Sequence, residues 1–211
     1  LCLARRLPEF DRYVRRGGWK MAVPGNHNGI LLSEKTLGII GYGRIGQVVA
    51  QRARAFNMRV IHHRLQNTND SDYRSLPDLL AESDFVSLHT PLTPDTKKLI
   101  NEERLALMKK GSYLINTSRG PVVDESALVI ALQNGHLAGA AIDVFEDEPR
   151  IHPGLINIEN VVLTPHLGGG ARETRLKAHH ICCENILAVI RGDSPPNALN
   201  EPENPRNQCH K

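Results

Sequence analysis

Arg119, Glu148 and His166 have side chains that together could bind a small anion and move a proton, and each follows a short apolar run. The guanidinium fork of Arg119 can hold a carboxylate by two parallel hydrogen bonds and can polarise a ketone. The imidazole of His166 titrates near neutral pH and suits a proton donor. Glu148, as a neighbouring negative charge, would orient the imidazolium and favour its protonated form. These three residues are therefore the candidate catalytic residues.

Each of the three also has a simpler interpretation. Arg119 could bind a cofactor phosphate, Glu148 could be a surface acid in an acidic loop, and His166, which follows a proline, could cap a turn. Their order along the chain and their shared place on the expected fold favour the catalytic interpretation.

The stretch 38–46 has the spacing of a dinucleotide-binding turn, G-x-G-x-x-G, between an apolar run at 36–40 and an amphipathic helical pattern at 47–56. In such a turn the first glycine permits the tight bend, the second lets a pyrophosphate approach the backbone, and the third lets the helix pack on its strand. The free N–H groups at the start of the helix then face the anion. The residues expected to bind the dinucleotide here are Gly41, Gly43, Arg44, Ile45 and Gly46.

Composition excludes several classes of protein. A hydrophobic content of 40% and a charged content of 23% over 211 residues are typical of a soluble globular protein. No apolar run is long enough to span a membrane and no signal sequence is visible, so we expect a cytoplasmic protein with no membrane partner. The basic residues near the start share a helical segment with apolar residues at helical spacing, which favours an interface or solvated helix over nucleic-acid binding.

No metal site is expected from the cysteines and histidines. The chain has four cysteines, without a C-x-x-C pair, and Cys182 and Cys183 are adjacent, so that their side chains diverge on a helix. We expect reduced, structural cysteines. The adjacent pairs at 62–63 and 179–180 diverge in the same way and form no metal fork.

Short apolar strands alternate with helical segments, which predicts an α/β fold, a doubly wound parallel sheet of the Rossmann type. The expected strands are 36–40, 58–63, 84–89, 111–116, 138–142 and 161–163. The expected helices are 1–16, 47–56, 76–81, 102–110, 124–134 and 172–190, and 19–35 is expected to be a loop. Ligands of such sheets bind at the carboxyl ends of the strands. The residues that this places along one rim are Gly41, Arg64, His89, Thr117, Arg119, Asp143 and His166.

Three later motifs are more specific than the glycine turn: Arg-Gly-Pro-Val-Val-Asp-Glu at 119–125, Leu-Ala-Gly-Ala-Ala-Ile-Asp-Val-Phe at 137–145, and Asn-Val-Val-Leu-Thr-Pro-His at 160–166. With them the chain resembles the D-isomer-specific 2-hydroxyacid dehydrogenases, and among these the glyoxylate/hydroxypyruvate reductases, from Leu1 to about Asn200. The resemblance implies reduction of a small 2-oxo acid to the D-2-hydroxy acid by hydride transfer from NAD(P)H. It gives Arg119, Glu148 and His166 the roles argued above.

The resemblance also extends the expected cofactor site. Further residues expected to bind the cofactor are Arg64, Pro91, Thr96, Thr117, Arg119, Asp143, His166 and Gly168. Asp143 has two interpretations, a hydrogen bond to the nicotinamide amide or a cap on the next loop. His89 is expected to line the nucleotide side of the site and not to act as a base.

The residues after the second strand bear on the choice of coenzyme. An NAD site usually presents an acidic residue about 20 positions beyond the first glycine, to bond the ribose hydroxyls. Here His62, His63 and Arg64 occupy this place, and no carboxylate occurs before Asp70. Arg64 would attract a 2′-phosphate, so we favour NADP over NAD. The alternative is that Arg64 is a loop residue facing solvent.

The domain organisation departs from the pattern of the resembled family. Residues 1–192, including a leading helix within 1–18, are expected to form the dinucleotide-binding domain. The proline-rich segment 193–211 is expected to be the return segment of a substrate domain whose N-terminal part is missing, because the chain begins with Leu1 inside a helix. The leading helix resembles the family's dimerisation segment and predicts a homodimer, or else it is an interdomain helix.

Three functions follow from these features. The first is a 2-oxo acid reductase of which this chain supplies the coenzyme domain. The second is a nucleotide-binding fragment without catalysis, and the third is a dinucleotide-sensing interaction protein similar to corepressors related to the family. The retained Arg119, Glu148 and His166 favour the first.

Overall fold

The computed structural model of the chain describes residues 1–20, 28–65 and 70–200. The chain divides into two compact units, residues 1–165 and 166–211. The predicted functional division at 192/193 is a different one and stays a prediction.

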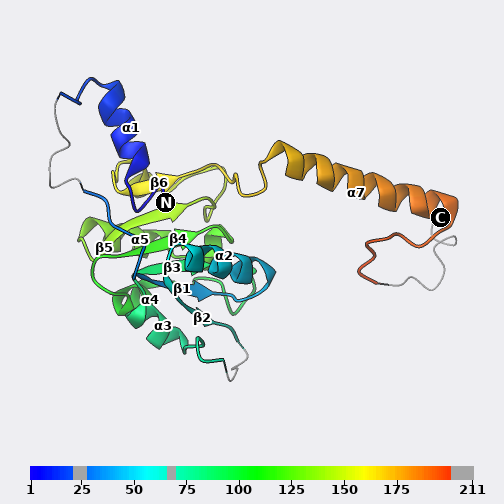
Figure 1. The fold of residues 1–211 in the computed structure, drawn as a ribbon, viewed down its shortest axis with the longest axis horizontal. Coiled ribbons are helices and arrows are strands. Elements are labelled where there is room, and N and C mark those ends of the chain that lie inside the picture. The colour runs from blue at the N-terminus through cyan, green and yellow to red at the C-terminus, as the bar shows by residue number, and fades with distance from the viewer. Residues whose placement is uncertain (21–27, 66–69, 201–211) are drawn as a thin grey trace. The chain divides into compact units, whose positions relative to one another are not determined.

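The first unit is built on one six-stranded parallel sheet (Figure 1). Its strands are β1 (Thr36–Ile40), β2 (Arg59–His63), β3 (Phe85–Leu88), β4 (Ser112–Asn116), β5 (Leu137–Ile142) and β6 (Val161–Leu163). They lie in the order β2-β1-β3-β4-β5-β6, and every neighbouring pair is parallel. The predicted fold class is therefore confirmed, and the strand bounds differ from the predicted ones by at most one residue.

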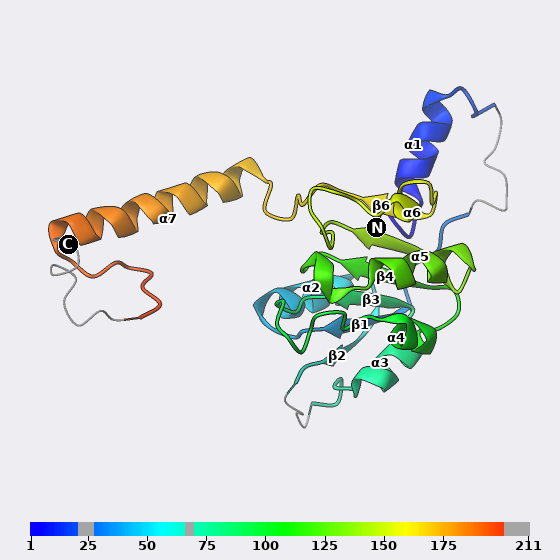
Figure 2. The same cartoon turned by 180° about the vertical axis from the view of Figure 1, so that it is seen from behind.

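Helices cover both faces of this sheet (Figures 1 and 2). The helix α2 (Arg44–Ala55) lies on one face, and α3 (Leu76–Glu82), α4 (Glu102–Leu107) and α5 (Glu125–Gln133) lie side by side on the other. The reason is the change of direction at β1: the connection from β1 to β2 runs one way along the sheet and all later connections run the other way. Right-handed crossovers then place the helices on opposite faces. The ends of β1 and β3 therefore flank a topological switch point.

Each face has its own core of buried side chains. The larger cluster lies under α3, α4 and α5 and includes Leu79, Leu88, Leu114 and Leu128, each with no exposed surface. The smaller cluster lies under α2 and includes Ile39 and Ala50. Burial of such aliphatic side chains stabilises the fold by roughly 1.5–3 kcal/mol each. These cores hold the strands in register and so fix where the strand ends lie.

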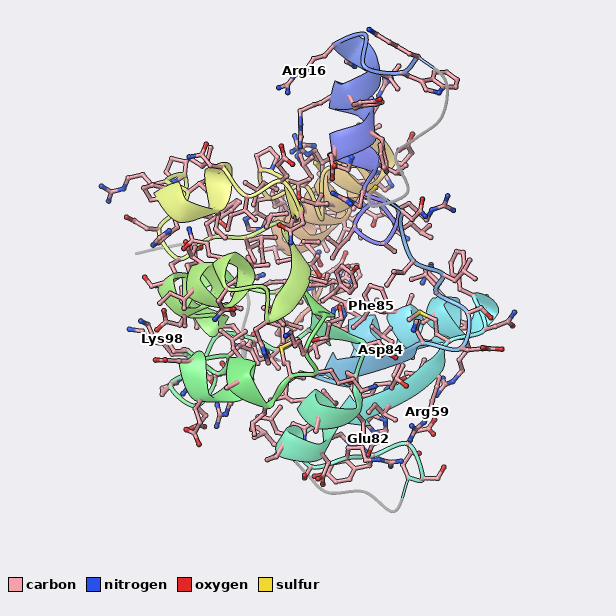
Figure 3. The ribbon with its side chains drawn as sticks, turned by 90° about the vertical axis from the view of Figure 1, so that its left-hand side faces the viewer. Arg16, Arg59, Glu82, Asp84, Phe85 and Lys98 are labelled. Atoms are coloured by element: carbon pink, nitrogen blue, oxygen red, sulfur yellow. The ribbon has the colours of Figure 1, made fainter. Side chains whose placement is uncertain are left out.

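Charged pairs gather at the amino ends of the strands. Figure 3 shows Arg59, Glu82 and Asp84 on the same side of the first unit. The Arg59 guanidinium lies 2.9 Å from the Glu82 carboxylate, and the amide of Thr36 donates to Asp84 at 2.8 Å. Lys109 also donates to Asp84, at 3.2 Å. These contacts join β2 to α3, and they join β1 and the segment before β4 to the residue that precedes β3. They lie at the amino edge of the sheet, opposite the carboxyl ends of the strands.

The N-terminal helix is shorter than predicted. The helix α1 spans Leu7–Arg15, whereas the expectation was 1–16. Residues 1–6 form turns because Arg6 has a left-handed backbone conformation, φ 52°, and because Leu3 and Ala4 are buried in the core of the first unit. The predicted stop is confirmed: Gly17 has φ 71° and the amide of Gly18 donates to the Tyr13 carbonyl.

Other helix ends also differ from the predicted ones. The helix after the glycine turn begins at Arg44 and not at 47, and α4 ends at Leu107, before the lysines that were expected to close it. A short helix, α6 (Pro153–Ile156), was not predicted, because a four-residue helix leaves no periodic pattern. Of the expected loop 19–35, residues 21–27 lie outside the described part of the chain.

The second unit contains a 20-residue helix, α7 (Arg172–Arg191), ended by Gly192 in a left-handed conformation, φ 81°. After it, the amide of Asn197 donates to the side chain of Asn185 at 3.0 Å. Cys182 and Cys183 are free and exposed, as is Cys2 in the first unit. These three cysteines form no disulfide, as expected, but their exposure gives no sign of the structural role that was expected of them. Cys209 lies outside the described residues. No group of metal-ligating side chains occurs in the described ranges, and none of the helices there is long and apolar enough to cross a membrane.

Candidate functional site

The predicted rim is formed by the carboxyl ends of the six strands. Because all strands are parallel, the residues that follow them lie along one edge of the sheet. Those residues are Gly41 after β1, Arg64 after β2, His89 after β3, Thr117 after β4, Asp143 after β5 and Thr164 after β6.

The glycine turn has the shape that its spacing predicts. Gly41 has φ 95°, and a Cβ there would lie 2.6 Å from the backbone carbonyl of His89. A Cβ on Gly46, inside α2, would lie 2.3 Å from the carbonyl oxygen of Gly41, so only glycine permits this approach of helix to strand. Gly43 differs, because a Cβ there would meet no protein atom within 4 Å. Arg44 and Ile45, in the first turn of α2, are exposed.

At the end of β2, the side chains of three successive residues differ in their exposure to solvent. His62 is fully buried and stacks on Tyr42 of the glycine turn, with ring centroids 3.8 Å apart. Burial lowers the pKa of His62, so the ring stays neutral at ordinary pH. His63 is half-buried and pairs through Nδ1 with the carbonyl oxygen of Arg74 at 3.0 Å. Arg64 is exposed, so that of these three residues it presents a charge to solvent at the carboxyl edge of the sheet.

The turn that carries Arg119 is held by a polar network that was not predicted from the sequence. The Asn116 side-chain oxygen accepts from the amide of Ser118 at 3.0 Å and from its hydroxyl at 2.9 Å, and the Asn116 amide group donates to the Arg119 carbonyl at 3.0 Å. The Asn-x-Ser pattern at the strand end was the available signal, since such side chains shape turns. The side chains of Thr117 and Arg119 remain exposed, and one Arg119 nitrogen donates to the Ser118 carbonyl at 2.6 Å.

The loop after β5 carries Asp143 and Glu148. Asp143 is buried, and its carboxylate accepts a hydrogen bond of 2.5 Å from the hydroxyl of Thr164, which links the ends of β5 and β6. Its amide donates to the Asn116 carbonyl at 3.0 Å, which joins this loop to the Arg119 turn. Glu148 is exposed and accepts from the amide of Phe145 at 3.1 Å.

The loop after β3 contains Pro91 and Thr96. The Thr96 hydroxyl donates to the Pro91 carbonyl at 2.7 Å and accepts from the amide of Thr93 at 2.8 Å. These bonds make Thr96 a residue that shapes the loop. His89 pairs with the hydroxyl of Ser87 at 2.9 Å, and burial lowers its pKa. The expected place of His89 beside the nucleotide stays a prediction.

His166 and Gly168 lie at the start of the second unit. His166 has a left-handed backbone conformation, φ 53°, and the following turn is closed by a bond of 2.7 Å from the amide of Gly170 to the carbonyl of Leu167. The structure therefore brings the segments that carry Arg119 and Glu148 together in the first unit. His166 belongs to the second unit.

Residues 1–168 match the family model of the D-isomer specific 2-hydroxyacid dehydrogenase, NAD binding domain. The chain is 44% identical over 211 residues to a glyoxylate reductase of Thermococcus litoralis, an alignment that covers 95% of this chain and 64% of the relative. Among solved structures it resembles the TT0316 protein of Thermus thermophilus, with 48% identity, a TM-score of 0.90, and 95% of this chain and 65% of that one covered. It also resembles an NADPH-dependent glyoxylate/hydroxypyruvate reductase of Sinorhizobium meliloti in complex with NADP and malonate, with 34% identity, a TM-score of 0.85, and coverage of 92% and 62%.

The chain spans less than two thirds of the length of these relatives. The match to the family model nevertheless covers the whole parallel sheet, the glycine turn and all the candidate site residues through Gly168. The chain therefore belongs to the D-isomer specific 2-hydroxyacid dehydrogenase family, whose NAD-binding domain is matched by its residues 1–168.

Proposed function

We propose that this chain is the coenzyme-binding part of an NAD(P)H-dependent reductase that converts a small 2-oxo acid, of the glyoxylate or hydroxypyruvate type, into the D-2-hydroxy acid. One observation carries the proposal: the glycine turn and the Arg119 turn lie on the same carboxyl edge of one parallel sheet. A dinucleotide site and a carboxylate anchor on one edge are what such a reaction requires.

The residues at the glycine turn fit a dinucleotide. Gly43 is the N-cap of α2, and no side chain caps this helix or places an acid in its first turn. The helix N-terminus therefore keeps backbone donors for an anion, and the missing Cβ of Gly43, which no protein contact demands, lets a pyrophosphate approach. We assign the nucleotide to Gly41–Gly46, Arg64, Thr117 and Asp143, with Pro91 and Thr96 shaping the neighbouring loop, and Gly168 stays a predicted contact. The bound nicotinamide would supply the hydride.

The protein's own groups supply the rest of the chemistry. Arg119 binds the substrate carboxylate through its guanidinium and polarises the ketone. His166 donates the proton to the developing alkoxide, and Glu148 orients the imidazolium.

We further propose that the coenzyme is NADP. The support is the exposed Arg64 at the end of β2, where an NAD site usually has a carboxylate. The relative of 34% identity whose structure contains NADP is itself NADPH-dependent. Binding of a 2′-phosphate by Arg64 would make this residue the main determinant of coenzyme choice.

We also propose a homodimer formed through α1. No residue of this helix is buried, and the apolar side chains of Leu7 and Val14 are about half exposed, at 51% and 50%. These two residues are seven apart and so share one helix face. In light scattering, the double variant Leu7→Asp with Val14→Asp should halve the mass of the particle; a wild-type monomer would contradict the proposal.

The function is tested by turnover of glyoxylate and hydroxypyruvate with NADPH and NADH, followed at the nicotinamide absorbance. We expect activity in the wild-type chain, a loss of about 100-fold or more in kcat for His166→Gln, and a rise in KM for Arg119→Ala. Nucleotide binding without turnover would instead identify a nucleotide-binding fragment and overturn the reductase.

A further inference from the structure

We propose that Glu125 and Glu146 form a carboxylate clasp that positions the loop carrying Glu148 against the turn carrying Arg119. The clasp is a structural claim about the first unit alone. Its effect on catalysis rests on the function proposed above, in which Arg119 and Glu148 act in the same reaction.

The two glutamates bind each other's backbone. The amide of Glu125 donates to Oε1 of Glu146 at 2.8 Å, and the amide of Glu146 donates to Oε1 of Glu125 at 2.7 Å. Bonds from an amide to a carboxylate are short and stronger than neutral ones. Two such bonds, made reciprocally between residues 21 positions apart, fix one backbone segment against the other in two places.

The clasp lies directly between the two candidate catalytic residues along the chain. Glu125 begins α5, immediately after the turn that starts at Arg119, and Glu146 lies two residues before Glu148. The neighbouring amide, that of Phe145, donates to the Glu148 carboxylate at 3.1 Å. A shift of Glu146 would therefore be passed directly to Glu148.

A backbone contact beside the clasp leaves no space between the segments. A Cβ on Gly120 would lie 1.8 Å from the carbonyl oxygen of Phe145 and 2.5 Å from the amide nitrogen of Glu146. The Arg119 turn and the Glu148 loop thus touch at Gly120 and are bonded at Glu125. The glycine contact limits how near the segments come, and the clasp prevents them from separating.

The environment of Glu125 argues against a role in stability alone. Its side chain is buried, with 6% of the residue exposed, although burying a carboxylate is costly. The nearby charges are mixed. Glu146 faces it, Asp147 pairs with Arg150 at 2.7 Å, Asp124 pairs with Lys98 at 2.8 Å, and His152 lies on the next loop. An acid in the first turn of α5 would serve the helix dipole equally well if it were exposed. Here it reaches instead to the amide of another loop.

The test compares four variants of the full chain: Glu125→Ala, Glu125→Gln, Glu146→Ala and, as a matched control, Glu103→Ala. Glu103 is likewise in the first turn of its helix, α4, but it is exposed. Glutamine keeps an oxygen acceptor and should preserve the clasp. The measurements are amide hydrogen exchange at residues 125, 145 and 146, the affinity for NADPH, and kcat and KM for glyoxylate.

If the clasp exists, Glu125→Ala and Glu146→Ala raise amide exchange at these positions by about tenfold or more, and Glu125→Gln and Glu103→Ala do not. If it positions Glu148, the two alanine variants lower kcat by roughly 10- to 100-fold and leave the affinity for NADPH within twofold, and Glu125→Gln restores kcat. Unchanged exchange in Glu125→Ala, or an equal loss of kcat in Glu103→Ala, would overturn the inference.

Failure of the clasp and failure of the proposed function give different results. A wild-type chain without turnover would contradict the reductase function. The amide exchange data would then show by themselves whether the clasp exists. An active wild-type chain in which Glu125→Ala keeps full kcat would contradict the positioning role and leave the reductase standing.

Discussion

Gly120 packs against Phe145 so closely that a Cβ on the glycine would lie 1.8 Å from the phenylalanine's carbonyl oxygen. This contact joins the turn after β4 to the loop after β5, and it is made by backbone on both sides. Neither segment can yield by rotating a side chain.

A change of Gly120 to alanine should therefore be costly. The added methyl group must push the two segments apart, and overpacking of this kind typically costs about 1–3 kcal/mol. We expect a lower midpoint in urea unfolding and a weaker reductase activity, because the Arg119 turn is displaced. An unchanged midpoint would show that the segments separate freely, contrary to the structure.

The glycines of the dinucleotide turn should respond differently to the same substitution. Gly46→Ala places a Cβ 2.3 Å from the Gly41 carbonyl oxygen and should destabilise the fold, whereas Gly43→Ala meets no protein atom within 4 Å. We expect Gly43→Ala to keep the wild-type melting temperature and to weaken NADPH binding by about tenfold or more. Calorimetry and fluorescence titration separate the two effects. Tight nucleotide binding by Gly43→Ala would argue against a pyrophosphate at this turn.

Arg64 should decide between the coenzymes. Loss of a charge-assisted hydrogen bond to a 2′-phosphate costs about 1.5–3 kcal/mol, which is roughly a 10- to 100-fold loss in affinity. Arg64→Ala should thus weaken the binding of NADPH and leave the Kd for NADH within twofold of the wild-type value. Arg52→Ala, an exposed arginine on α2, is the matched control and should change neither affinity. Equal weakening of both nucleotides by Arg64→Ala would exclude the phosphate contact.

Burial of His62 predicts a loss of stability in acid. Burial lowers the pKa of this ring, Arg64 and Arg54 act in the same direction, and Asp70 and Asp72 oppose them. The unfolded chain then binds a proton more readily than the folded one. Stability from this residue is present above the ordinary histidine pKa of about 6.5 and falls as the pH drops through and below it.

His62→Phe should remove this acid sensitivity and keep a flat ring stacked on Tyr42, whose ring lies 3.8 Å from that of His62. The free energy of unfolding, measured from pH 7.5 down to about pH 5, should decline less steeply in the variant than in the wild type. His179→Phe, on the exposed surface of α7, should retain the wild-type decline. Parallel curves for His62→Phe and wild type would contradict a neutral, buried His62.

Much of the fold follows from local patterns in the sequence. The apolar runs at 36–40 and 161–163 became β1 and β6 with no change of bounds, since a strand buried in a parallel sheet must be apolar throughout. The predicted ends of the helices were less accurate than those of the strands. The glycine turn passes into α2 three residues earlier than the apolar period shows, because the first turn of that helix, with Arg44 and Ile45, faces outward.

The site was only partly predictable for a similar reason. Strand ends could be located, so Arg64, Arg119 and Asp143 were placed on the rim correctly. The contacts between loops could not be predicted, because the clasp of Glu125 with Glu146 joins residues 21 positions apart and leaves no periodic pattern in the sequence. The hydroxyl of Thr164, bonded to Asp143, is a further example. The catalytic roles of Arg119, Glu148 and His166 stay predictions.

Titration of the purified chain with NADPH and with NADH, followed by nicotinamide fluorescence, shows whether a nucleotide binds at the glycine turn, and every proposed role depends on that binding. We predict saturable binding of both nucleotides, tighter for NADPH, and NADPH binding weaker by about tenfold or more in Gly43→Ala without loss of folded structure. Failure of the folded wild-type chain to bind either nucleotide would contradict a dinucleotide site at the glycine turn, and with it the proposed function.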